Sequence, residues 1–179
     1  RCIVMPYAEG GSLQDHVDRV GPLPAEQVVS FGAQLAHAVA CAHHLGVIHC
    51  DITPSNLLVT DPDTAVLAGF GSASFVDVRG SSEPPEASWP FAAPEVLDGA
   101  AAGPRSDVYS LGLSLLTLAL GCNPFAGSAT RGLRLVDSIC TRGIPRSAFD
   151  ELPVGRCTAL RRAARRRNGK RAWLRPARP

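Results

Sequence analysis

Several features are scarce in this sequence, and each shortage excludes a class of protein. The 179 residues hold six cysteines but no CxxC pair, and no signal peptide precedes them, so we expect neither a disulfide framework nor a zinc ribbon. The longest apolar run, residues 108–122, is too short to span a bilayer. Glycine and proline are scattered without a period, which excludes collagen and repeat arrays. We therefore expect a cytoplasmic chain with reduced thiols and no membrane segment.

Lysine is almost absent, since Lys170 is the only one and every other basic residue is arginine. From residue 156 to the end there are ten basic residues and no acidic ones, whereas the first 155 residues carry eight basic and sixteen acidic residues, a balance of −8. The arginines between 161 and 167 have no interleaved aromatics and no reader motif, so nucleic acid is not the expected partner. A solvated helix face, an acidic protein or the acidic body of the chain explains them better.

The remaining composition, 45% apolar and 19% charged, is typical of one globular domain. Apolar residues recur every three or four positions after Pro24 and stop before Gly46, which predicts a long helix. A second helix is predicted from Ser106, as its N-cap, to Gly121. Because it is apolar around most of its circumference, we place it at the centre of the domain. Weaker helices are expected at 131–139 and 157–167.

The β-structure is predicted to be minor. Runs of β-branched residues and leucine indicate short strands at 47–48, 57–60 and 65–67, and the opening run 2–8 is typical of a strand that enters a turn at Gly10. Residues 72–92 are rich in Ser, Pro, Gly and Glu without periodicity, which favours a long exposed loop with a functional role. The expected fold class is α+β, mainly α.

One segment carries a pattern suited to catalysis. Asp51 and Asn56 lie five residues apart in the sequence Ile48-His-Cys-Asp-Ile-Thr-Pro-Ser-Asn, directly before a hydrophobic strand. That spacing suits a general base and a metal ligand. The segment resembles the catalytic loop of protein kinases, whose pattern is H-R-D-x-x-x-x-N.

Further motifs of the same family follow in the family's order. The resemblance covers nearly the whole chain: a hinge at 5–13, Gly69-Phe-Gly71 at the DFG position, Ala93-Pro-Glu95 at the APE position, a central helix start at 106–112, its exit at 121–125, and a late arginine, Arg171. It implies the large, C-terminal lobe of a bacterial Ser/Thr kinase domain. Its parts are a hinge strand and linker (1–12), a catalytic and metal-loop region (47–73), an activation segment (72–95) and a helical subdomain with a basic tail (106–179).

The resemblance assigns roles around the reaction. Asp51 is the expected acceptor of the substrate hydroxyl proton, and the side-chain oxygen of Asn56 is the expected Mg²⁺ ligand. Ser88 stands where Ser/Thr-specific kinases carry a hydroxyl residue shortly before APE. The resemblance also implies ATP as phosphoryl donor and a protein substrate.

Other roles concern the nucleotide and the scaffold. The hinge residues Pro6 (carbonyl), Ala8 (amide) and Ser12 and the apolar floor residue Leu58 are the expected ATP contacts. His49 is expected beneath the loop and Phe70 in a structural position. Asp107 is expected to cap backbone amides of the catalytic loop, and Glu95 to form a buried pair with Arg171.

Three departures from the family pattern weaken the expected chemistry, and a fourth, at Cys50, bears on control by phosphorylation. Gly69 replaces the metal-binding Asp of DFG, and losing one preorganised electrostatic group costs on the order of 10² to 10³ in rate. Thr53 replaces the Lys that touches the γ-phosphate, and Cys50 replaces the Arg that binds an activation-loop phosphate. The small lobe's Gly-rich loop, Lys and Glu do not precede residue 1. Asp61 and Asp63 lie on a turn that leads away, so we do not expect them to substitute for the missing ligand.

Three interpretations stay open. The chain is part of a Ser/Thr kinase that needs an upstream small lobe, a pseudokinase that docks a partner or another kinase, or a decayed fragment. A zinc site at the nearby Cys and His residues is not expected, because no paired spacing supports it; these residues are Cys41, His43, His44, His49 and Cys50.

Overall fold

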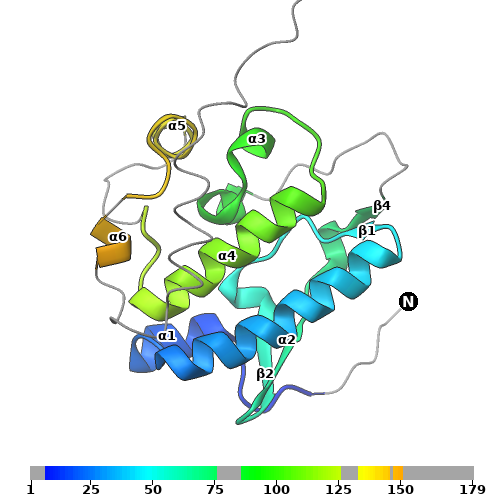
Figure 1. The fold of residues 1–179 in the computed structure, drawn as a ribbon, viewed down its shortest axis with the longest axis vertical. Helices are drawn as coiled ribbons and strands as arrows, with labels where there is room; N and C mark the ends of the chain where they lie inside the picture. Colours follow the sequence, from blue (N-terminus) through cyan, green and yellow to red (C-terminus); the bar gives the residue numbers. More distant parts are fainter. Residues whose placement is uncertain (1–6, 76–85, 126–132, 146, 151–179) are drawn as a thin grey trace, which may run out of the picture.

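The computed structural model describes residues 7–75, 86–125, 133–145 and 147–150, and the fold is built around one central helix. Helix α4 (Pro104–Leu120) lies alongside the long helix α2 (Ala25–His44), as Figure 1 shows. Helix α1 (Leu13–Val20) and a β-hairpin pack on the α2 side. Helices α3 (Pro94–Leu97) and α5 (Leu133–Asp137) lie on the opposite side of α4 (Figure 1), and α6 (Ser147–Asp150) is a single turn.

Helix α2 forms where the apolar period predicted it. Its buried residues recur every three or four positions, so that they form one apolar face: Val28, Phe31, Leu35 and Val39. That face packs against α4 and strand β3. Gly46, at φ +73°, follows the end of the helix. The prediction for this helix is confirmed.

Helix α4 separates two hydrophobic cores, which confirms its predicted central position. Leu111, Leu115 and Leu118 face the core shared with α1 and α2, whereas Leu113 and Leu116 face a second core that includes Phe125, Leu135 and Ile139. A helix that serves two cores must be apolar on both faces, and this explains the composition of residues 108–120.

The predicted N-cap of α4, Ser106, was wrong by three residues. The helix begins at Pro104, with Gly103 as N-cap, and Ser106 lies in its first turn. The Ser106 hydroxyl accepts a hydrogen bond from the Gly103 amide (2.8 Å) and donates to the Gly103 carbonyl (2.7 Å), so it secures the cap from inside the helix. Proline is favoured at the first helical position because its missing N–H has no intrahelical partner there.

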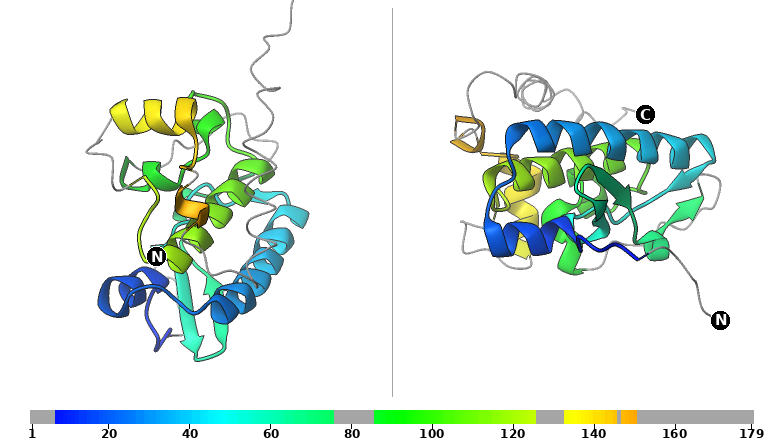
Figure 2. Two further views of the ribbon diagram at one scale, coloured as in Figure 1. Left: turned by 60° about the vertical axis from the view of Figure 1, so that its left-hand side comes forward. Right: turned by 90° about the horizontal axis from the view of Figure 1, so that it is seen from below.

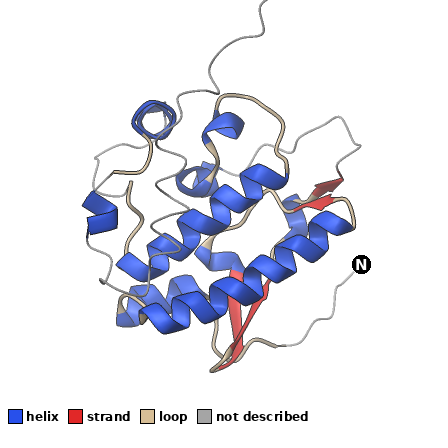
Figure 3. Ribbon diagram, in the orientation of Figure 1, coloured by secondary structure: helices blue, strands red, loops and turns tan. Residues whose placement is uncertain are grey.

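Two small antiparallel sheets hold the loops of the site (Figure 3). Strands β2 (Leu57–Asp61) and β3 (Thr64–Leu67) form a hairpin with Leu57 opposite Leu67 and Leu58 opposite Val66. Strand β1 (Val47–Ile48) pairs with β4 (Ser74–Phe75). The three predicted strands after residue 46 are thus confirmed.

The described parts of segment 72–92 contain more regular structure than the predicted exposed loop. Its described parts include the end of the 3₁₀ turn η2 (Phe70–Ser72), strand β4 and the 3₁₀ segment η3 (Glu86–Phe91). Backbone pairing with β1 supplies hydrogen-bond partners that the local composition does not reveal. Residues 76–85 lie outside the described part of the chain.

The segment before α1 is fastened to the hairpin. The Gly10 amide donates to the Val59 carbonyl and the Val59 amide to the Gly11 carbonyl, each at 2.9 Å, and Ser12 forms a β-bridge with Leu58. Figure 2 shows this segment beside the hairpin from two further directions. Most of the predicted opening strand, residues 2–6, lies outside the described residues, and Tyr7 and Ala8 are not in a strand.

The C-terminal predictions are tested only in part. Residues 133–142 are helical, as α5 followed by a π-helical turn (Ser138–Arg142), close to the predicted 131–139. The predicted helix 157–167 and the basic tail lie outside the described residues. None of the helices in the described ranges is both long and apolar enough to cross a membrane.

Candidate active site

The loop between β1 and β2 brings Asp51 and Asn56 into direct contact. The Nδ2 group of Asn56 donates to the Asp51 carbonyl at 2.8 Å and to Asp51 Oδ2 at 3.0 Å. A 3₁₀ turn, η1 (Pro54–Asn56), supplies the close approach, because its first residue Pro54 has the φ that such a turn needs. The sequence predicted that these two residues share a site, and the geometry places them together.

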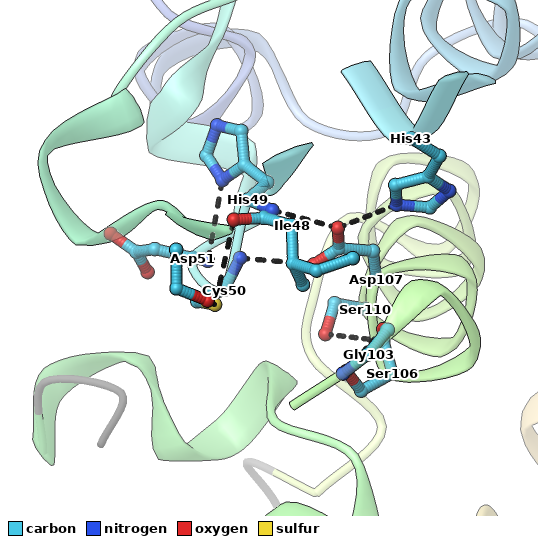
Figure 4. A network of polar contacts seen from close by, with 10 residues as sticks. His43, Ile48, His49, Cys50, Asp51, Gly103, Ser106, Asp107 and Ser110 are labelled. Carbon is cyan, nitrogen blue, oxygen red and sulfur yellow. Dashed lines mark hydrogen bonds and ion pairs between the residues drawn. The ribbon is translucent and has the colours of Figure 1, made fainter. Parts of the chain in front are cut away.

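Asp107 fixes the start of this loop. Its carboxylate, only 1% exposed, accepts hydrogen bonds from the backbone amides of His49 (2.8 Å) and Cys50 (3.0 Å), as Figure 4 shows. A buried charge is tolerated only when it is paired and hydrogen-bonded. The position of Asp107 is the one that the family resemblance implied.

Sequence reasoning missed two residues that support the loop. His43, near the end of α2, approaches Asp107 Oδ2 with its Nε2 at 2.8 Å (Figure 4). The buried Ser114 of α4 donates its hydroxyl to the Ile52 carbonyl at 3.2 Å. Both partners lie about sixty residues away in sequence, so no local spacing could have indicated these contacts.

Cys50 has an unusual backbone. Its φ of +66° is the only positive value at a non-glycine residue in the described ranges. The left-handed conformation costs an L-residue about 1–2 kcal/mol. The hydrogen bond from the Cys50 amide to Asp107 Oδ1 offsets part of that cost, so Asp107 helps to hold the turn that presents Asp51.

The three residues predicted to act in the reaction line one small pocket. Asp51, Thr53 and Ser88 border a space of about 10 Å³, which is roughly one water in size. Five other residues complete its wall: Cys50, Ile52, Phe91, Ala92 and Ser110. The Oδ1 atom of Asp51 is buried without a hydrogen-bond partner, so this carboxylate has a free acceptor atom.

His49 lies beneath the loop, in the expected position. It is 1% exposed, its Nε2 lies 2.9 Å from the Ala68 carbonyl, and its Nδ1 accepts from the Asp51 amide at 3.3 Å. Its ring is 4.5 Å from that of Phe70, centroid to centroid. These contacts connect the catalytic loop to the Gly69-Phe-Gly71 segment.

Three of the four predicted nucleotide-contacting residues, Ala8, Ser12 and Leu58, lie in the described part of the chain, and one of them has another role. Ala8 and Leu58 are partly exposed, and the Ser12–Leu58 bridge brings the hinge segment to the hairpin. Ser12, however, is buried, and as the N-cap of α1 its hydroxyl accepts a hydrogen bond from the Asp15 amide at 3.1 Å and donates one to Asp15 Oδ2 at 2.6 Å. Its side chain is therefore used for helix capping. Pro6 lies outside the described residues.

The residues present do not fit a magnesium site with two protein ligands. Mg²⁺ requires oxygen ligands in near-octahedral geometry, usually including carboxylates. Asn56 offers one neutral side-chain amide oxygen, and Gly69 has no side chain to offer another. Asp61 and Asp63 lie at the opposite end of the β2–β3 hairpin from Asn56. Among the described residues no group of three or more His, Cys, Asp and Glu side chains is arranged to hold a metal ion.

One member of the predicted Glu95–Arg171 ion pair is more exposed than expected. Glu95, in α3, is exposed, whereas the resemblance implied a buried carboxylate. The α3 helix has only four residues and lies at the surface, which leaves this side chain accessible to water. Its expected partner Arg171 is outside the described residues, so the pairing itself stays a prediction.

Two groups away from the catalytic loop have shifted pKa values. The hydrogen bonds from the hydroxyl and the amide of Ser12 lower the pKa of Asp15. Burial raises the pKa of Cys140, and the nearby carboxylates of Asp98, Asp137 and Glu95 raise it further.

Comparison with known proteins identifies the family. The family model described as "Protein kinase domain" matches residues 1–149. The chain is 37% identical over 166 residues to the serine/threonine-protein kinase PknK of Mycobacterium bovis, covering 92% of the chain and 15% of that protein. It is 32% identical over 174 residues to PknL of Mycobacterium tuberculosis, covering 92% of the chain and 43% of that protein. The chain thus spans less than half the length of each of these relatives.

Proposed function

This chain belongs to the protein kinase family, and from that premise we propose that it is the large lobe of a Ser/Thr kinase domain whose phosphoryl transfer is severely impaired. The family transfers a phosphoryl group from ATP with Mg²⁺, mostly by positioning and by neutralising charge. The observation that carries the proposal is the contrast between a well-held Asp51 and a residue 69 that has no side-chain carboxylate.

The proton-accepting part of the site supports the family assignment. Asp51 Oδ1 is buried without a hydrogen-bond partner, and Asp51 lines a pocket together with Ser88. A hydroxyl group placed there could donate its proton to Oδ1, while Asn56 holds Oδ2. Asp107 and Ser114 fix the loop on both sides of Asp51. These residues orient a base and need no metal to do so.

Two residues that would help to neutralise the charge of the phosphates are replaced in this chain. Gly69 removes a carboxylate from the metal site, and Thr53 removes a lysine charge beside Asp51. Thr53 is buried and its carbonyl accepts from the Asn56 amide at 2.9 Å, so it supports the loop without supplying a cation. Electrostatic stabilisation is usually the largest catalytic term, and its loss explains an impaired enzyme.

A transfer assay tests this proposal. The full product of the gene that encodes this chain is incubated with labelled ATP, Mg²⁺ or Mn²⁺ and a general protein substrate, beside its Asp51→Asn variant. We expect both proteins to transfer phosphate at least about 10²-fold more slowly than the roughly 1–100 s⁻¹ typical of kinases. Transfer within that range by the unmodified protein, abolished by Asp51→Asn, would contradict the proposal.

A pseudokinase that binds a partner is the second candidate. The observation that favours a loss of transfer is the carboxamide of Asn56, which occupies the space where a residue-69 side chain would begin, so that no metal-binding side chain stands there. A scaffold needs the fold but not the base, so a cellular phenotype of gene deletion should be complemented by the Asp51→Asn gene. Failure of that variant to complement, at wild-type protein level, would favour the enzyme.

A further inference from the structure

The side chain of Asn56 fills the space beside Gly69. The loss of a metal ligand at residue 69 does not by itself require this close packing. Gly69 follows β3 with φ +84° and ψ 33°. A Cβ atom on residue 69 would lie 2.7 Å from Asn56 Nδ2, and closer still to Asn56 Cγ and Oδ1. Real Cβ contacts essentially never fall below 3.0 Å. Any side chain at residue 69 must therefore displace the Asn56 carboxamide.

Asn56 is not free to move aside. Both N–H bonds of its carboxamide are used, one on the Asp51 carbonyl and one on Asp51 Oδ2. The amide orientation follows from these partners, because both are acceptors and only Nδ2 can donate to them. The backbone is held too: the Asn56 amide donates to the Thr53 carbonyl, and its carbonyl accepts from the Ala68 amide, each at 2.9 Å.

A positive φ does not by itself bring this crowding. Gly46 and Gly99 have similar positive φ values, +73° and +88°, but an added Cβ on either would meet nothing within 4 Å. Glycine at those two positions is explained by the backbone conformation alone. At residue 69 the same conformation is combined with a neighbouring side chain in the space of the Cβ.

We propose that Asn56 is a positioning residue for Asp51, and that the missing side chain at residue 69 gives its carboxamide the room to act in this way. We call this arrangement the interlock: the Asn56 carboxamide fills the space that a side chain at residue 69 would need. The inference rests on the proposed function only in taking Asp51 as the base. It follows that Gly69→Asp cannot simply restore a metal site, because the new side chain must break the hydrogen bonds that hold Asp51.

A double-mutant cycle tests the interlock by equilibrium unfolding of the chain. Gly69→Ala and the matched control Gly99→Ala introduce the same Cβ at nearly the same φ. We expect Gly69→Ala to raise the unfolding equilibrium constant at least about tenfold more than Gly99→Ala does. In an Asn56→Ala background that excess should disappear. An excess that persists without the Asn56 carboxamide, or no excess at all, overturns the interlock.

A second variant separates positioning from metal ligation and does not depend on a substitution at residue 69. Asn56→Asp supplies a better Mg²⁺ ligand, but it removes both hydrogen-bond donors and sets a carboxylate against Asp51. A positioning role predicts a lower unfolding midpoint that 10-fold changes in Mg²⁺ concentration do not recover. A variant as stable as the wild type, or one whose midpoint Mg²⁺ restores, contradicts that role. Because unfolding reports the contact and phosphate transfer reports the reaction, failure of this inference is distinguishable from failure of the proposed function.

Discussion

His43 and Asp107, 64 residues apart in sequence, meet at 2.8 Å between Nε2 and Oδ2 and join the end of α2 to the start of α4. The same Oδ2 atom accepts from the His49 amide, and Oδ1 accepts from the Cys50 amide. Since both oxygens already accept backbone N–H groups, the carboxylate acts as an acceptor and His43 Nε2 as the donor. One buried charge therefore ties two helices to the loop that carries Asp51.

Removing the donor at residue 43 should weaken this connection. His43→Leu leaves Asp107 with one fewer partner, which costs about 1–3 kcal/mol for a buried group that loses its hydrogen bond. His43→Gln can keep an N–H donor and should lose less. Urea unfolding measures both, and hydrogen exchange at the His49 and Cys50 amides should accelerate only in the Leu variant. Equal behaviour of the two variants would show that the donor is not what matters.

Gly10 should not tolerate alanine, because the backbone lies against the hairpin there. An added Cβ would lie 2.8 Å from Val59 Cβ and Cγ1 and 2.9 Å from the Val59 carbonyl oxygen. We expect Gly10→Ala to cost about 1–3 kcal/mol, the usual range for overpacking. Gly71→Ala is the control, since nothing lies within 4 Å of its added Cβ. Comparable unfolding midpoints for the two variants would argue against the close pairing of residues 10–12 with β2.

Cys140 should react slowly with iodoacetamide. Its pKa is raised by burial and by the neighbouring carboxylates, so less thiolate, the reactive form, is present near neutral pH. Cys41 and Cys122 are exposed free thiols and serve as internal references. Peptide mapping by mass spectrometry after timed alkylation at pH 7.5 gives the order of reaction. Alkylation of Cys140 ahead of both exposed thiols would contradict the described packing.

The capping of α1 predicts a pH effect of known sign. Ser12 lowers the pKa of Asp15 in the folded chain, so the ionised carboxylate stabilises the folded state above the unfolded pKa of about 3.9. That stabilisation is lost as the pH falls through the lower, folded value. An NMR titration of the Asp15 carboxyl should show the lowered pKa, and Ser12→Ala should return it toward its ordinary value. No change in Ser12→Ala would mean that the cap does not cause the shift.

Local signals in the sequence predicted much of this fold. Apolar periodicity placed α2 and the centre of α4, and β-branched runs placed the hairpin strands, because each pattern reports one buried face. The spacing of Asp51 and Asn56 predicted their shared site. Ser12 was predicted as an ATP contact, but its sequence context carries a signal for its capping role, because Ser12 with an acidic residue three positions later, Asp15, resembles a capping box.

What escaped prediction depends on contacts between distant segments. The pairing of Ser74 and Phe75 with β1 exists only once the chain has turned back on itself, and the composition of 72–92 indicates a loop. His43 gave no signal of its role because its partner lies on another helix. The clash between Asn56 and a Cβ added at residue 69 likewise depends on the φ of residue 69 and on the orientation of the Asn56 side chain, and motif spacing encodes neither.

The most direct measurement of the central claim is a Mn²⁺ titration of the ¹⁵N-labelled chain in the presence of a non-hydrolysable ATP analogue. A paramagnetic ion held at the catalytic loop selectively broadens the amide signals of the residues around it. We predict that the Asn56 and Gly69 signals broaden no more than those of the exposed Asp61 and Asp63, because residue 69 has no side-chain oxygen and Asn56 is hydrogen-bonded to Asp51. Selective broadening at Asn56 and Gly69 at low Mn²⁺ concentration would contradict it.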